Sequence, residues 1–107
     1  MWWRKKKPQK DWIVGGLYLE QGEENDWKVF KVLLVDGHGV HIRFYQERFR
    51  EKPQDINCAT LTVDIGHSPF AFETVAKWQE EFLRQDRVDE QELDGYQEWK
   101  EAQGGYW

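Results

Sequence analysis

WKVFKVLLVDGHGVHIRFY, residues 27–45, decides the fold of this chain. Residues 27–35 are rich in β-branched and aromatic side chains, and residues 40–45 alternate between apolar and polar, so both segments are predicted to be strands. The Asp36-Gly37 pair between them is a strong signal for a tight hairpin, and Gly39 allows a longer loop with a bulge. The stretch therefore predicts an antiparallel hairpin at the centre of a small sheet.

Side-chain alternation assigns each residue of this hairpin to a face of the sheet. Both faces of residues 27–35 are apolar, so we expect one to look into a curled sheet and the other to be covered by C-terminal helices. The side chains of the second strand that are expected in the core are Val40, Ile42 and Phe44. Those expected to point outward are His41, Arg43 and Tyr45.

The flanking segments extend this hairpin into an α+β domain. Gly15-Gly16 predicts a turn into a short strand, and residues 59–65 predict a further strand. A helix is predicted over about residues 69–85, because Ser68 suits an N-cap and apolar side chains recur at helical spacing after it. A second helix is predicted over about 89–103, where Asp89 and Glu92 match a capping box.

Length and composition bound the organisation of the chain. One hundred and seven residues suit one domain, which we place at residues 12–107, preceded by a flexible basic arm at residues 1–11. The single Cys58 favours a reducing compartment, and no apolar run reaches the roughly 18 residues that span a bilayer. A cytoplasmic protein is the resulting expectation.

Charge and motifs narrow the classes of function. The net charge of −5 argues against non-specific nucleic-acid binding, which depends on Lys and Arg. No glycine-rich phosphate loop or cysteine knuckle is present, so no cofactor and no metal are expected. A small metal-dependent hydrolase that uses His41, Asp64 and His67 is kept as an alternative, although the spacing of the histidines does not favour their convergence.

Aromatic side chains carry the leading functional prediction, because the chain holds seven Trp, six Phe and four Tyr. Rings at strand ends or on outward faces can form a peptide groove or a box for a cationic side chain, with a carboxylate beside them. The competing interpretation is that the same rings form core. The residues predicted to bind a protein or peptide ligand are Trp12, Tyr18, Trp27, Asp36, Arg43 and Tyr45.

The basic arm supports a second alternative, a peripheral attachment to membranes. Indole rings settle at lipid headgroups while cations meet anionic lipid. The arm residues predicted to contact a membrane or a partner are Trp2, Trp3, Arg4, Lys5, Lys6 and Lys7.

Three segments resemble the strand order of SH3-like and Tudor-like small barrels. They are WIVGGLY (12–18), DWKVFKVLLVD (26–36) and VHIRFY (40–45). The resemblance implies an antiparallel β-barrel whose aromatic rim falls on Tyr18, Trp27 and Tyr45. The end of the chain, ELDGYQEWKEAQGG (92–105), looks like the tail of uncharacterised bacterial proteins. The fold expected is therefore this barrel with the two predicted C-terminal helices.

Overall fold

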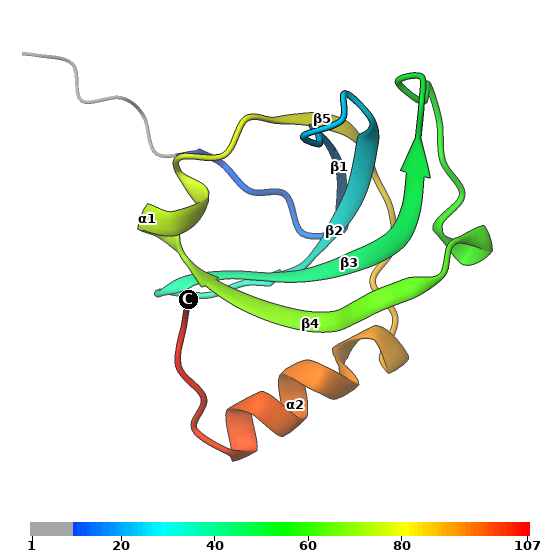
Figure 1. Cartoon of the computed structure of the whole chain (residues 1–107). Helices are drawn as coiled ribbons and strands as arrows, with labels where there is room; N and C mark the ends of the chain where they lie inside the picture. The colour runs from blue at the N-terminus through cyan, green and yellow to red at the C-terminus, as the bar shows by residue number, and fades with distance from the viewer. Residues whose placement is uncertain (1–9) are drawn as a thin grey trace, which may run out of the picture.

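Five antiparallel strands form one curled sheet in the computed structural model, which describes residues 10–107 (Figure 1). The strands are β1 (Gly16–Gln21), β2 (Trp27–Val35), β3 (Gly39–Phe49), β4 (Val63–Ala71) and β5 (Glu80–Gln85), and their order across the sheet is β4-β3-β2-β1-β5. The helices are α1 (Phe72–Val75) and α2 (Asp94–Glu101), with 3-10 turns at Cys58–Thr60 and Gln91–Leu93. The α+β class is confirmed.

The β2–β3 hairpin forms as predicted and turns on Asp36. The Asp36 amide donates to the Gly39 carbonyl at 3.0 Å, while its Oδ1 accepts from the His38 and Gly39 amides at 2.8 Å each. An aspartate at this position satisfies turn amides that no strand partner reaches. The hairpin therefore closes through the side chain that the sequence placed at its tip.

Both faces of β2 are covered, as its two apolar faces predicted. The first group, the Phe30 cluster, contains the buried side chains of Tyr18, Phe30, Val32, Val40, Ile42 and Val75, with Trp12, Phe44 and Trp78 packed against them. The second group, the Tyr45 cluster, contains the buried side chains of Leu19, Val29, Tyr45 and Ile56. Because residues on one strand alternate between the two groups, the clusters lie on opposite faces of the sheet.

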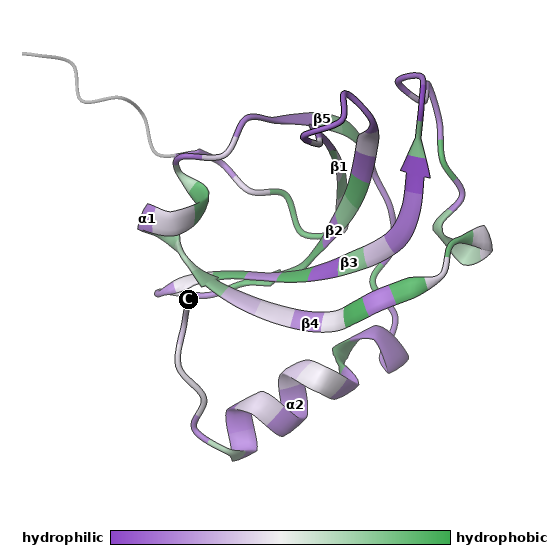
Figure 2. Ribbon diagram, viewed as in Figure 1, coloured by the Kyte–Doolittle hydropathy of each residue, from purple (hydrophilic) through white to green (hydrophobic). Residues whose placement is uncertain are grey.

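The cover of the second face differs from the expected pair of packed helices. The loop after β3 supplies Ile56, Cys58 and Leu61 to the Tyr45 cluster. Helix α2 lies beyond β4, on the side opposite α1 (Figure 1). It carries mostly hydrophilic residues (Figure 2). Loop and tail segments thus replace much of the predicted helical layer.

The helix predicted over 69–85 is wrong except for residues 72–75. Ser68 and Pro69 belong to β4, and the Ser68 hydroxyl is buried without a hydrogen-bond partner among the described residues. Residues 80–85 form β5, which pairs with β1. The free edge of β1 needs a partner for its backbone groups, and this non-local pairing outweighs a local apolar spacing that suits a helix.

The remaining differences are smaller. The predicted strand at 59–65 begins later, at Val63, after the 3-10 turn. The predicted helix at 89–103 is a 3-10 turn followed by α2, and its capping box is formed: the Asp89 amide donates to Glu92 Oε1 at 3.0 Å and the Glu92 amide to Asp89 Oδ1 at 2.9 Å. The sequence signal for this start was therefore correct.

Candidate functional site

The six residues predicted to bind a ligand do not form one exposed rim. Tyr18 is 5% exposed in the Phe30 cluster, with Trp12 beside it at a ring-centroid distance of 5.2 Å. Tyr45 is 6% exposed in the Tyr45 cluster, where Trp27 packs half-buried. The prediction that Tyr45 and His41 point to solvent is wrong, because the face opposite Val40 and Ile42 is itself covered.

A groove at the ends of β1 and β5 combines two tryptophans with three carboxylates. Its volume is about 500 Å³, and it is lined by Leu19, Glu20, Gln21, Trp27, Trp78, Gln79, Glu80 and Glu81. We call it the acidic groove. Among the predicted ligand residues only Trp27 lines it.

The glutamates of this groove crowd one another. Glu20 lies directly opposite Glu80 across the β1–β5 pair, a like-charge arrangement that is unfavourable unless a cation relieves it. Burial raises the pKa of Glu20, nearby Lys28 opposes that rise, and the charge of Glu80 adds to it. Glu20 has no ion-pair partner among residues 10–107.

Two lysines that do not line the groove already pair with two of its glutamates. The Lys10 ammonium lies 2.9 Å from Glu80 Oε2 and 5.6 Å from the centre of the Trp12 ring. The Lys52 ammonium pairs with Glu81 and lies 5.5 Å from the centre of the Trp27 ring. Each pair of contacts places an ammonium between a carboxylate and an indole face, a geometry that attracts cations.

Sequence reasoning missed Trp78, Glu20, Glu80 and Glu81. All but Glu20 fall in the helix predicted over about residues 69–85, which does not bring them to Glu20. The available signal was the run of residues 80–85, which is short enough for an edge strand, but its partner is some sixty residues away in the chain. Only the pairing of β5 with β1 brings these side chains together.

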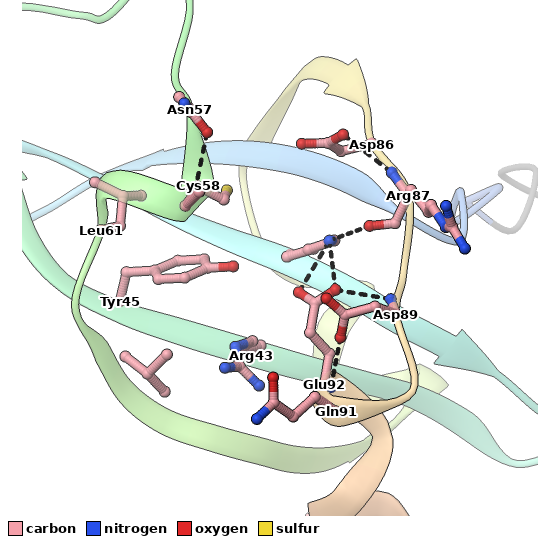
Figure 3. A pocket seen from close by; sticks show the side chains of 13 residues that line it. Arg43, Tyr45, Asn57, Cys58, Leu61, Asp86, Arg87, Asp89, Gln91 and Glu92 are labelled. Carbon is pink, nitrogen blue, oxygen red and sulfur yellow. Dashed lines mark hydrogen bonds and ion pairs between the residues drawn. The ribbon is translucent and has the colours of Figure 1, made fainter.

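A second cavity, of about 460 Å³, lies over the middle of β2 and β3, between the 57–61 turn and residues 86–92 (Figure 3). Arg43 and Tyr45, two of the predicted ligand residues, line it together. Burial raises the pKa of Tyr45, and its hydrogen bond to the Cys58 thiol raises it further. Burial also raises the pKa of Cys58, so this thiol stays protonated at neutral pH.

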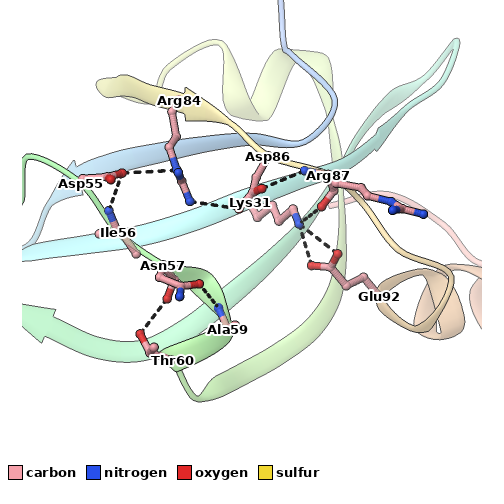
Figure 4. A network of polar contacts seen from close by, with 10 residues as sticks. All are labelled: Lys31, Asp55, Ile56, Asn57, Ala59, Thr60, Arg84, Asp86, Arg87 and Glu92. Carbon is pink, nitrogen blue, oxygen red and sulfur yellow. Dashed lines mark hydrogen bonds and ion pairs between the residues drawn. The ribbon is translucent and has the colours of Figure 1, made fainter.

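A buried ion pair closes one wall of this cavity (Figure 4). Lys31 is 3% exposed, and its ammonium donates to both Glu92 carboxylate oxygens at 2.9 Å and to the Arg87 carbonyl. The cavity lining carries three cations and three carboxylates, in Lys31, Arg43, Arg87, Asp86, Asp89 and Glu92. This balance gives the cavity no net preference for a charged ligand.

Two histidines converge beneath α2, which the sequence analysis did not favour. His41 Nε2 lies 2.8 Å from Asp36 Oδ2, and His41 Nδ1 lies 2.7 Å from His67 Nε2. With both rings neutral, His67 donates to His41, which donates to Asp36. Tyr106 also donates to Asp36.

This hydrogen-bonded chain does not match the predicted hydrolase. Asp64 is exposed and takes no part in this hydrogen-bond network, in which the acid is Asp36. His41 is fully buried, and Tyr96 and Trp99 of α2 lie against its ring. Within residues 10–107 no group of three or more His, Cys, Asp or Glu side chains is arranged to hold a metal ion. The arrangement attaches α2 and the tail to the sheet.

Burial and hydrogen bonds set the ionisation of Asp36 and His67 in this network. Burial alone raises the pKa of Asp36, but hydrogen bonds from Tyr106, His41 and two backbone amides hold that pKa well below its ordinary value. Burial, with the adjacent His41, lowers the pKa of His67 to about 4. At neutral pH the network therefore holds a carboxylate and a neutral His67.

The predicted arm contacts of Trp2, Trp3, Arg4, Lys5, Lys6 and Lys7 lie outside the described residues. Among residues 10–107 no helix has the length and apolar character needed to cross a bilayer. Comparison with known proteins gave no matching family model, no similar curated protein and no similar solved structure.

Proposed function

We propose that this chain is a non-enzymatic protein-interaction module with an SH3-like barrel fold, and that it binds lysine-bearing segments of a partner protein in the acidic groove. The barrel is supported by the strand order, which has β4 and β5 at the two edges, and by the curl of the sheet. The ligand class is supported by the groove's two indoles and three carboxylates.

The observation that carries the proposal is the pairing of Glu20 with Glu80 beside Trp78. Glu20 stands between Lys28 on β2 and Glu80 on β5, and no ammonium among residues 10–107 lies within 4 Å of its carboxylate, so the two facing carboxylates keep a local need for positive charge. An incoming ammonium gains charge-assisted hydrogen bonds of about 1.5–3 kcal/mol. An indole face adds about 0.5–2 kcal/mol.

The contacts of Lys10 and Lys52 support lysine as the recognised side chain. Both residues reach the groove glutamates by a flexible stem, and both place the ammonium near an indole ring. A lysine from a partner meets the same chemistry at Glu20. The net charge of −5 further favours basic partners over nucleic acid.

Isothermal titration with short blocked peptides tests this function. An acetylated, amidated Gly-Lys-Lys-Lys-Gly peptide should bind, and its Gly-Gln-Gln-Gln-Gly counterpart should not. Glu20→Gln should weaken binding at least about tenfold, which corresponds to about 1.4 kcal/mol. The substitution removes a like-charge contact, so folding should be preserved.

The matched control is Glu98→Gln, which makes the same change at an exposed site on α2. It should leave peptide affinity unchanged. Binding should also weaken between 50 and 300 mM salt, since exposed charge pairs are screened. Equal affinity for the two peptides, or full affinity in Glu20→Gln, would contradict the proposed ligand class.

A further inference from the structure

We propose that the acidic groove is masked in the resting chain by the chain's own residues 4–7, Arg-Lys-Lys-Lys, acting in cis. This inference rests on the proposed function, because it assumes that the groove recognises lysine. It adds a regulator to that function: a partner must displace an internal segment before it can bind. The support comes from Lys10, from the reach of the preceding residues and from charge.

Lys10 holds the start of the described chain against the groove. Its ammonium binds Glu80 Oε2 at 2.9 Å, the Val75 carbonyl at 3.2 Å and the Trp78 carbonyl. Glu80 and Trp78 both line the groove. Lys10, the first described residue, is therefore tied to the edge of the groove by an ion pair with Glu80, whose side chain is only 10% exposed.

The distances along the chain suit this occupant. An extended chain spans at most about 3.3–3.6 Å per residue, so Lys7 reaches about 10 Å from Lys10 and Arg4 about 20 Å. Glu81 follows Glu80 directly, and Glu20 lies opposite Glu80 in the sheet. All three carboxylates therefore fall within the reach of residues 4–7.

Charge completes the match. Residues 4–7 are four consecutive cationic side chains, and residues 1–10 contain no acid. The groove carries three glutamates and no basic lining residue. Lys52 shows that a lysine of this same chain settles on Glu81 and the Trp27 ring. Glu20 is the carboxylate that residues 4–7 would satisfy.

Masking in cis predicts a measurable loss of affinity for external ligands. A short tether gives an effective concentration in the millimolar range, and apparent affinity falls by the fraction of molecules whose groove is open. For a peptide of weak intrinsic affinity, the masked chain should bind at least about threefold more weakly than an unmasked one.

The test is titration of the Gly-Lys-Lys-Lys-Gly peptide into the full chain carrying Lys5→Gln, Lys6→Gln and Lys7→Gln. This variant should bind the peptide at least threefold more tightly than the unchanged chain. The control removes the same number of charges from exposed sites elsewhere, by Arg50→Gln, Arg87→Gln and Lys100→Gln. It should not tighten binding, because its arm is intact.

The outcomes separate the two proposals. Unchanged affinity in the arm variant, together with weakened binding in Glu20→Gln, would overturn masking and leave the proposed function standing. No binding by any chain would overturn both. Titrations at two protein concentrations address the geometry: a gain that grows with protein concentration would assign the arm to a neighbouring copy and overturn masking in cis.

Discussion

Lys31 is a charged residue in the middle of β2, and Glu92 is its one acidic partner among residues 10–107. Its side chain is 3% exposed and that of Glu92 is 14% exposed. Removing one partner of such a pair leaves the other charge buried and uncompensated. Glu92 also completes the capping box at Asp89, so one carboxylate attaches the 86–93 segment to the sheet and orders its turn.

Glu92→Gln should therefore destabilise the fold by about 3 kcal/mol, measured by urea denaturation. Glu90→Gln, at an exposed neighbouring position, should stay within about 0.5 kcal/mol of the unchanged protein. Lys31→Met combined with Glu92→Leu should recover most of the loss, because two apolar side chains leave no uncompensated charge. A single Glu92→Gln variant as stable as the parent would refute the role given to this pair.

His67 gives the protein a stability that declines in mild acid. Its folded pKa of about 4 lies below the ordinary value of 6.5. Between these values the unfolded chain binds the proton and the folded chain does not, so stability falls as pH drops from about 6.5 to about 4. His67→Gln keeps a donor beside His41 and should flatten this decline when urea midpoints are compared at pH 7, 6, 5 and 4.5. Parallel curves for the two proteins would exclude His67 as the cause.

At the scale of elements, the β2–β3 hairpin leaves almost no room beside β4. A Cβ added to Gly39 would lie 2.1 Å from the Phe70 carbonyl oxygen, whereas one added to Gly37 would meet nothing within 4 Å. Gly39→Ala should cost about 2–3 kcal/mol, since backbone must move to relieve the overlap. Gly37→Ala in the same turn is the control and should cost far less. Comparable thermal midpoints for the two variants would disprove the tight packing of Gly39 on β4.

Elements set by local chemistry could be predicted from the sequence, and elements set by distant pairing could not. The Asp36 turn and the Asp89 capping box are read from adjacent residues, and both form. β5 was missed because its strand character depends on β1, some sixty residues earlier. For the same reason most of the acidic groove could not be predicted. Trp27 was predicted as a ligand-binding residue, but Glu20 and Glu80 come together only when β1 and β5 pair.

At the scale of the whole molecule, the two faces of the curled sheet are covered by different segments of the chain. On one face α1 closes the Phe30 cluster, and Lys10 ties the start of the described chain to the end of this helix. On the other face the loop before β4 and the tail cover residues that were expected to be exposed. The acidic groove lies where β1 ends and β5 begins, apart from the segments that cover the two faces.

The most direct test of lysine recognition is to follow the indole N–H signals of the protein by NMR while the Gly-Lys-Lys-Lys-Gly peptide is added. Trp27 and Trp78 line the groove, whereas Trp99 donates its indole N–H to the Gly105 carbonyl at 3.0 Å beneath the sheet. Binding of lysine in the groove should shift the Trp27 and Trp78 signals and leave the Trp99 signal stationary. Stationary Trp27 and Trp78 signals at saturating peptide, or a shift confined to Trp99, would contradict it.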